Sequence, residues 1–162
     1  MSINKYDNFL IIETEDDANR QILNGFMKGV GLNIRKIQLS NHCSGWSSVI
    51  NKFESKMISY LNEYQKGYVI MVIDFDDHYD ERKRMIEEKI PSNLYNRVFV
   101  LGAKKEPEDL KRNLGLNYEA IGEKMADGFL DNNHQLWECE DLKHNLEELH
   151  RACIQIRSFI YA

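Results

Sequence analysis

The sequence predicts an α/β fold in which a four-stranded, mainly parallel sheet is flanked by helices. Short apolar runs rich in β-branched residues alternate along the chain with longer stretches whose apolar side chains follow helical spacing. Strands that alternate with helices are joined by right-handed crossovers into a parallel sheet. The most apolar run, residues 68–73, stops abruptly at Asp74, and such a run is typical of a central strand covered on both faces.

Four strands are expected, at residues 8–12, 32–37, 68–73 and 97–101. The first is short, apolar and β-branched, whereas the second mixes apolar with charged residues and is expected to be less buried. Gly102 ends the fourth strand. The order of elements is therefore β-α-β-α-β-α-β, followed by helices alone.

The helices are expected where apolar residues recur every three or four positions. They lie at residues 18–29, 46–64, 80–89, 107–114, 118–130 and 136–159. Gly29 closes the first of them, and Pro91 ends the third. The last helix carries an apolar stripe that we expect to pack mainly on the sheet, and any excess would offer a surface for a second copy of the chain or another protein.

Size and composition describe an ordinary globular chain. With 162 residues, two prolines, no Gly/Ser linker and no internal repeat, residues 1–162 are expected to form a single domain.

The net charge of −5 argues against a dedicated electrostatic binder of nucleic acid, although a metal can offset a local acidic cluster in a nuclease. Three scattered cysteines without a CxxC pair argue against a zinc knuckle or disulfide framework and favour a reducing, cytoplasmic setting. We find no signal peptide and no apolar run near the roughly 20 residues of a membrane helix, so no membrane partner is expected.

Acidic residues follow three of the predicted strands, at the edge where their carboxyl ends meet. They are Glu13, Glu15, Asp16 and Asp17 after the first strand, Asp74, Asp76 and Asp77 after the third, and Glu106 and Glu108 after the fourth. Open parallel sheets bind ligands beyond this edge. Because like charges raise one another's pKa unless a cation neutralises them, we expect a hard ion with oxygen ligands there, Mg²⁺ or Mn²⁺.

The spacing of the carboxylates favours shared ligation. Asp74 and Asp76 lie at i and i+2 just beyond a strand, where side chains can point the same way. Glu13 and Asp17 would share a face if the following helix begins early. Acidic residues also favour the first turn of helices, which is the competing interpretation for each of them except Asp74. An acidic residue that ends so apolar a strand is better explained by function.

Taken in order, these motifs resemble the TOPRIM domain, and most closely the TOPRIM modules of OLD-family nucleases and related small bacterial defence-associated proteins. Glu13 and Asp17 match the strand–Glu–Gly–x–x–Asp segment of that family, with Thr14 in place of Gly. Asp74–Phe75–Asp76 matches its Asp-x-Asp motif. Glu108 matches a Glu that follows the next strand in OLD-like members.

The resemblance covers a core at residues 7–112 and leaves residues 113–162 as a C-terminal helical extension. It implies a Rossmann-like TOPRIM fold and Mg²⁺-dependent cleavage of phosphodiester bonds in DNA or RNA, in a setting such as anti-phage defence. The roles that it implies are general acid/base for Glu13 and metal ligation for Asp74, Asp76, Asp17 and Glu108. Lys104 and Lys105 are the candidates for contacts to the phosphate backbone, with a solvated basic loop as the equal alternative.

Two other functions stay open. Thr14, beside the implied acid/base, favours a catalytically weak TOPRIM-like subunit that binds and regulates a partner such as an ATPase, since the chain itself has no Walker A motif. The third hypothesis is a receiver-like signalling domain, because Asp74 and the segment 105–107 are similar to features of response regulators. The long second helix and the Asp-x-Asp pair are atypical of that fold.

Overall fold

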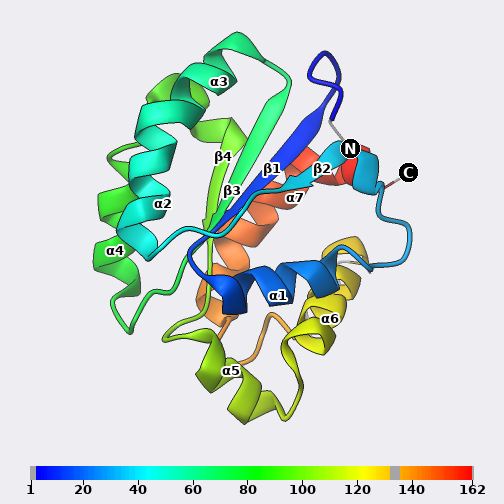
Figure 1. Cartoon of the computed structure of the whole chain (residues 1–162). Helices are drawn as coiled ribbons and strands as arrows, with labels where there is room; N and C mark the ends of the chain where they lie inside the picture. The colour runs from blue at the N-terminus through cyan, green and yellow to red at the C-terminus, as the bar shows by residue number, and fades with distance from the viewer. Residues whose placement is uncertain (1–2, 132–135, 162) are drawn as a thin grey trace.

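The structure, a computed structural model, describes residues 3–131 and 136–161 (Figure 1). Its strands are β1 (Phe9–Thr14), β2 (Ile37–Leu39), β3 (Gly67–Val72) and β4 (Val98–Leu101). Its α-helices are α1 (Asp17–Phe26), α2 (Trp46–Lys52), α3 (Ile58–Glu63), α4 (Tyr79–Glu87), α5 (Pro107–Leu114), α6 (Tyr118–Asp131) and α7 (Leu146–Ile160). A π-helical segment, Phe53–Met57, joins α2 to α3, and short 3-10 helices lie at Ile34–Lys36, Ser92–Arg97 and Lys143–Asn145. No helix within the described ranges combines the length and the apolar character needed to cross a membrane.

The strands form one sheet in the order β2-β1-β3-β4, and every neighbouring pair is parallel (Figure 1). The expected α/β fold with a parallel sheet is confirmed, and the sheet is fully rather than mainly parallel. The two central strands pair from Phe9 opposite Gly67 to Thr14 opposite Val72. The strand order reverses at β1, because β2 lies on one side of it and β3 on the other. The carboxyl ends of β1 and β3 therefore form the topological switch point, where open α/β sheets bind ligands.

The second strand is shorter and later than predicted. The sequence predicts a strand at residues 32–37, but Ile34–Lys36 form a 3-10 helix and β2 begins at Ile37. The side chain of Asn33 accepts a hydrogen bond from the backbone N–H of Arg35 and so caps that 3-10 turn. A local side-chain bond of this kind competes with strand pairing, which explains the difference.

The last helix is also shorter than predicted. It is expected from residue 136, but turns and a 3-10 helix precede it, and α7 begins at Leu146. The cause is the buried side chain of Asn145, whose Oδ1 accepts from the backbone N–H of Gly102 at 3.1 Å and whose Nδ2 donates to the Leu142 carbonyl at 3.0 Å. These bonds hold the chain against the end of β4 in a turn rather than a helix.

Helices cover both faces of the sheet, so strand residues alternate between two apolar clusters. On one face α2, the π-helical segment, α3 and α4 pack over Phe9, Ile11, Val69, Met71, Val98 and Val100. On the other face α1, α5, α6 and α7 pack over Leu10, Ile12, Ile70, Phe99 and Leu101. Since side chains alternate along a strand, Thr14 and Asp74 face α1, whereas Glu13 and Glu15 face α2.

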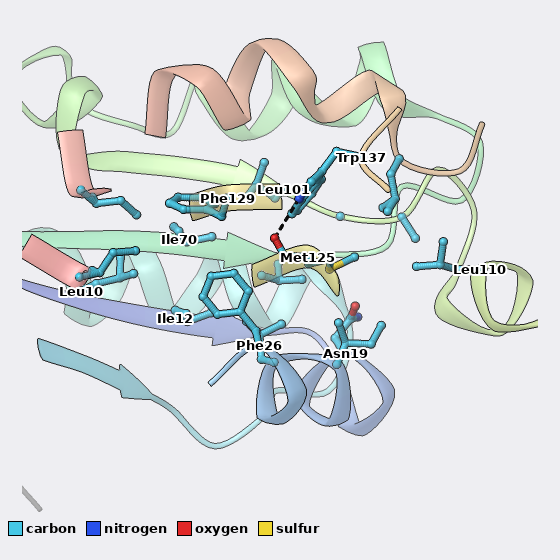
Figure 2. Close-up of a pocket in the computed structure, with 18 residues that line it drawn as sticks. Leu10, Ile12, Asn19, Phe26, Ile70, Leu101, Leu110, Met125, Phe129 and Trp137 are labelled. Atoms are coloured by element: carbon cyan, nitrogen blue, oxygen red, sulfur yellow. Dashed lines mark hydrogen bonds between the residues drawn. The ribbon is translucent and has the colours of Figure 1, made fainter. Parts of the chain in front are cut away.

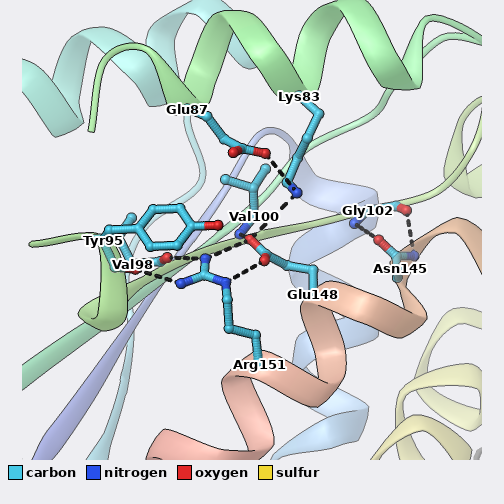
Figure 3. A network of polar contacts seen from close by, with 9 residues as sticks. All are labelled: Lys83, Glu87, Tyr95, Val98, Val100, Gly102, Asn145, Glu148 and Arg151. Atoms are coloured by element: carbon cyan, nitrogen blue, oxygen red, sulfur yellow. Dashed lines mark hydrogen bonds and ion pairs between the residues drawn. The ribbon is translucent and has the colours of Figure 1, made fainter. Parts of the chain in front are cut away.

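α7 closes the edge of the sheet at β4 (Figure 3). The buried carboxylate of Glu148 accepts a hydrogen bond from the backbone N–H of Val100 at 2.9 Å, and Asn145 bonds both the N–H and the carbonyl of Gly102. Arg151 donates to a β4 carbonyl at 2.7 Å and to both carboxylate oxygens of Glu148, at 2.7 and 3.0 Å. An edge strand otherwise presents these backbone groups to other strands, so Asn145 and the side chains of α7 satisfy part of this edge.

A small apolar cavity of about 60 Å³ lies between the sheet and helices α1, α5, α6 and α7 (Figure 2). One wall is fixed by Trp137, whose ring N–H donates to the Met125 carbonyl at 3.2 Å. Most of its lining is apolar, and cavities of that kind stay dry. Asn19 is a polar exception, and its side chain also belongs to the carboxyl edge described next.

Candidate functional site

The ends of β1 and β3 bring four acidic residues to the switch point of the sheet. Glu15 and Asp16 directly follow β1, and Asp74 and Asp76 follow β3. Backbone pairing continues past the strand ends, since the N–H of Glu15 donates to the Val72 carbonyl at 3.0 Å. These strand ends lie between α1, on one face of the sheet, and α4, on the other.

Asp74 is buried at the end of the central strand and points toward α1. The residue is 6% exposed, and its Oδ1 accepts a hydrogen bond from Asn19 Nδ2 at 2.8 Å. The same amide donates to Asp16 Oδ1 at 3.1 Å. Asp16 also caps α1 by accepting from the backbone N–H of Asn19 at 2.9 Å. One buried amide therefore bridges two carboxylates at the start of α1.

Glu15 contacts the backbone of Asp74 rather than its carboxylate. Glu15 is 8% exposed, and its Oε2 accepts from the N–H of Asp74 at 2.6 Å. Beyond Asp74 the chain turns through Asp76 and Asp77, whose φ angles of 47° and 62° lie in the left-handed region that Asp tolerates better than most residues. Their N–H groups donate to carbonyls of residues 104–105 at 3.1 and 2.8 Å. The loop after β3 is thus tied to the loop after β4.

Arg82, on α4, brings a positive charge into this acidic group. Its Nη1 donates to the backbone carbonyl of Asp74 at 2.6 Å and to the carboxylate of Asp76 at 2.8 Å. Its guanidinium carbon lies 4.5 Å from the centre of the Trp46 ring, at the start of α2, which is a cation–π contact. The arginine side chain is 14% exposed, whereas that of Asp76 is 51% exposed.

The electrostatic result is a carboxylate that stays protonated at neutral pH. The pKa of Asp74 is raised from 3.8 to about 8, first by burial and then by the charges of Glu15, Asp16 and Asp76, against the hydrogen bond from Asn19. Burial also raises the pKa of Glu15, with a further contribution from the charges of Asp16 and Asp76. The site therefore holds more carboxylate than the protein's own cations neutralise.

Glu13, the acid/base implied by the TOPRIM resemblance, is engaged elsewhere. It is 2% exposed, and its Oε2 accepts from Lys52 Nζ at 2.8 Å. Its Oε1 accepts from Ser40 Oγ at 3.2 Å. Glu13 thus lies within the sheet and joins β1 to the chain after β2 and to α2.

The other predicted site residues lie at the rim. Asp17 is exposed and accepts a hydrogen bond from the Gln21 side chain at 2.6 Å, one turn along α1. Glu108 is exposed in the first turn of α5. Lys104 and Lys105 each pair with an acidic side chain, at 3.3 and 3.6 Å. Within residues 3–131 and 136–161, no hydrogen bond or ion pair joins any of these four side chains to Asp74.

Sequence reasoning assigned no role to Glu15, Asn19 or Arg82, which contact Asp74 in the structure. Glu15 and Asn19 are four residues apart, as are Glu13 and Asp17, and they lie two residues later in the sequence. In the structure it is this later pair that contacts Asp74. The equal spacing of the two pairs could have identified the later one from the sequence. Arg82 has no comparable signal, because its contact depends on how α4 leaves the turn after β3.

The donors suit a divalent cation in kind and charge, but they are not gathered around one point. Asp74, Glu15 and Asp76 offer the carboxylate oxygens that Mg²⁺ and Mn²⁺ prefer. On the Asp74 face, Thr14 is fully buried, and its hydroxyl has no hydrogen-bond partner in the described part of the chain. In that same part, no three His, Cys, Asp or Glu side chains form a group that could hold a metal ion. A cation here requires a rearrangement, most simply the release of Asp76 from Arg82.

Comparison with known proteins assigns no family to the chain. No family model matches it, and no curated protein matches it either. The functional conclusion therefore depends on the geometry of the switch-point site.

Proposed function

We propose that the chain is an Mg²⁺- or Mn²⁺-dependent phosphodiester hydrolase with a TOPRIM-like site, acting on DNA or RNA. The observation that carries this proposal is the buried carboxylate of Asp74, whose pKa is raised to about 8 at the end of a central strand. Carboxylates perturbed in this way recur at functional sites, and the switch point is where this class of sheet binds ligands. A cation that replaces the proton of Asp74 would neutralise the cluster.

Asp74 and Asp76 are the proposed metal ligands. Asp76 is half exposed and its pairing with Arg82 is near the surface, where ion pairs are weak, so its carboxylate is free to exchange one cation for another. A bound metal would supply an activated water and stabilise charge on the phosphate oxygens. We leave Asp17 and Glu108 outside the ligand set, because both are exposed at the rim and Asp17 is bonded to Gln21.

We assign the acid/base role to Glu15 in place of Glu13. Glu15 contacts the backbone of Asp74 and has a raised pKa, and a general acid or base works best when its pKa approaches the working pH. Glu13 is buried in an ion pair with Lys52 and stabilises the sheet. Lys104 and Lys105 form only exposed ion pairs, so they stay the proposed contacts to the phosphate backbone.

The matched variants Glu13→Gln and Glu15→Gln test this assignment, with Asp74→Asn as the metal-site variant. Mg²⁺ and Mn²⁺ binding is measured by calorimetry, and cleavage is measured on labelled single-stranded DNA, double-stranded DNA and RNA. Asp74→Asn should lose metal binding and cleavage. Glu15→Gln should keep metal binding and lose cleavage, whereas Glu13→Gln should keep both.

Three results would contradict the proposal or its assignment of the acid/base. Metal binding by Asp74→Asn with wild-type affinity would place the cation elsewhere. Absence of cleavage by the wild-type chain on all three substrates, with either metal, would remove the hydrolase activity. Loss of cleavage in Glu13→Gln but not in Glu15→Gln would restore the original assignment.

A regulatory module that binds a partner protein, such as an ATPase, is the second candidate. The observation that favours it is that each central carboxylate already has a donor from the protein: Asn19 for Asp74 and Arg82 for Asp76. Such a site can be stable without a cation. The same measurements separate the two candidates, because a regulatory module would show neither metal binding nor cleavage and Asp74→Asn would change neither.

A further inference from the structure

The small cavity between the sheet and helices α1, α5, α6 and α7 holds a polar group that the proposed hydrolase does not use (Figure 2). Protein interiors contain few voids larger than a water molecule, and an empty one lowers stability. Water is a poor occupant here, because a buried water needs about three polar partners and the lining side chains are apolar apart from Asn19 and the already bonded ring N–H of Trp137. The cavity is therefore a candidate site for a small, mainly apolar molecule.

The unused polar group is the side-chain amide oxygen of Asn19, a residue that lines the cavity and is 2% exposed. The amide nitrogen donates to Asp74 at 2.8 Å and to Asp16 at 3.1 Å, so both of its protons are engaged and the orientation of the amide is fixed. Within residues 3–131 and 136–161, Oδ1 accepts no hydrogen bond. A buried carbonyl oxygen without a donor is costly, and an occupant with one proton donor would satisfy it.

The volume of the cavity limits the size of its occupant. It measures about 60 Å³, whereas an engineered apolar cavity of about 150 Å³ holds benzene. Less than half of that space suits a molecule of about three non-hydrogen atoms. We propose that the cavity binds a short-chain alcohol, with its alkyl group among the apolar side chains and its hydroxyl donating to Asn19 Oδ1. The inference depends neither on the proposed hydrolase activity nor on a metal.

Methyl NMR of the isoleucine residues tests the site in the metal-free protein. The side chains of Ile12, Ile70 and Ile156 line the cavity, whereas those of Ile11 and Ile73 belong to the apolar cluster on the opposite face of the sheet. Ethanol, titrated in EDTA, should shift the methyl signals of the first group and leave those of the second unchanged. We expect the shifts to saturate with a dissociation constant on the order of 10 mM, because so small a ligand buries little surface.

Two matched comparisons test the space in the cavity and the role of its acceptor. Val72→Ile adds one methylene group to a lining residue and should weaken ethanol binding roughly fivefold, because less of the alkyl group can be buried. Val30→Ile makes the same change at a position that is 80% exposed and should leave binding unchanged. Acetonitrile has as many non-hydrogen atoms as ethanol but no hydroxyl, so it should bind roughly fivefold more weakly than ethanol.

Each part of the inference has a result that would overturn it. Absence of shifts at Ile12, Ile70 and Ile156, or shifts that rise without saturation, would overturn the binding site. Equal ethanol affinity of Val72→Ile and Val30→Ile would place the alcohol outside the cavity. Equal affinity for ethanol and acetonitrile would overturn the hydrogen bond to Asn19. These results are independent of metal binding and cleavage, so the proposed function stands or falls separately.

Discussion

Replacing Asp74 with Asn should stabilise the metal-free protein, and the gain should grow with pH. The folded-state pKa of Asp74 is about 8, above the value of 3.8 in an unperturbed chain. The free energy of unfolding therefore falls as pH rises through this window, and the cost is fully present above pH 8. At about 1.4 kcal/mol per pH unit, the cost is about 4 kcal/mol at pH 7 and about 2 kcal/mol at pH 5. Asn keeps the oxygen that accepts from Asn19 and carries no charge.

Urea unfolding of the wild type and Asp74→Asn in EDTA, at pH 5, 7 and 8, measures this difference directly. Asp77→Asn is the matched control, because that residue is exposed and its removal should change stability by less than about 0.5 kcal/mol. Adding Mg²⁺ should stabilise the wild type but not Asp74→Asn. The difference in their free energies of unfolding should therefore shrink or change sign. Equal stability of the two proteins at pH 8, or a difference that does not grow from pH 5 to pH 8, would refute the reasoning about the buried carboxylate.

Three further predictions concern the fold. Glu148→Ala should lower the free energy of unfolding, measured in urea, by about 3 kcal/mol, because it leaves Arg151 without its buried partner. The exposed control Glu147→Ala should have little effect. A small effect of both variants would contradict this account. Gly102→Ala should prevent folding or expression, since its Cβ would lie 1.6 Å from the carbonyl oxygen that follows β3, and a folded variant of normal thermal stability would show that the strands can separate there. Val72→Ile should raise the melting temperature by about 2 °C by filling part of the cavity with one methylene group, and a lower melting temperature would indicate that the cavity cannot accept it.

The central sheet could be predicted because its strands carry local signals. The run at residues 68–73 corresponds to β3 (Gly67–Val72), and the run at residues 8–12 corresponds to the first part of β1 (Phe9–Thr14). Both runs are apolar on both faces, as strands between two helical layers must be. The alternation of strands and helices then determines the parallel arrangement.

The register of the candidate site could not be predicted, because β1 ends two residues beyond its apolar run. Glu13 ends that run in the sequence, but Lys52 and Ser40 satisfy its carboxylate from distant parts of the chain, so the strand continues to Thr14. The first carboxylate beyond the strand is consequently Glu15. Long-range ion pairs of this kind leave no mark in a local sequence pattern.

The edge of the sheet has a consequence for the order in which the chain folds. During synthesis β4 is made before α7, so the backbone groups that Glu148, Asn145 and Arg151 later satisfy remain exposed in the nascent chain. An exposed strand edge can pair with other chains, and intermediates that carry one are prone to aggregate. Protection of this nascent edge therefore comes from the segment of the described chain that is synthesised last. A chain truncated before residue 146 would keep a β4 edge that can pair with a strand of another chain.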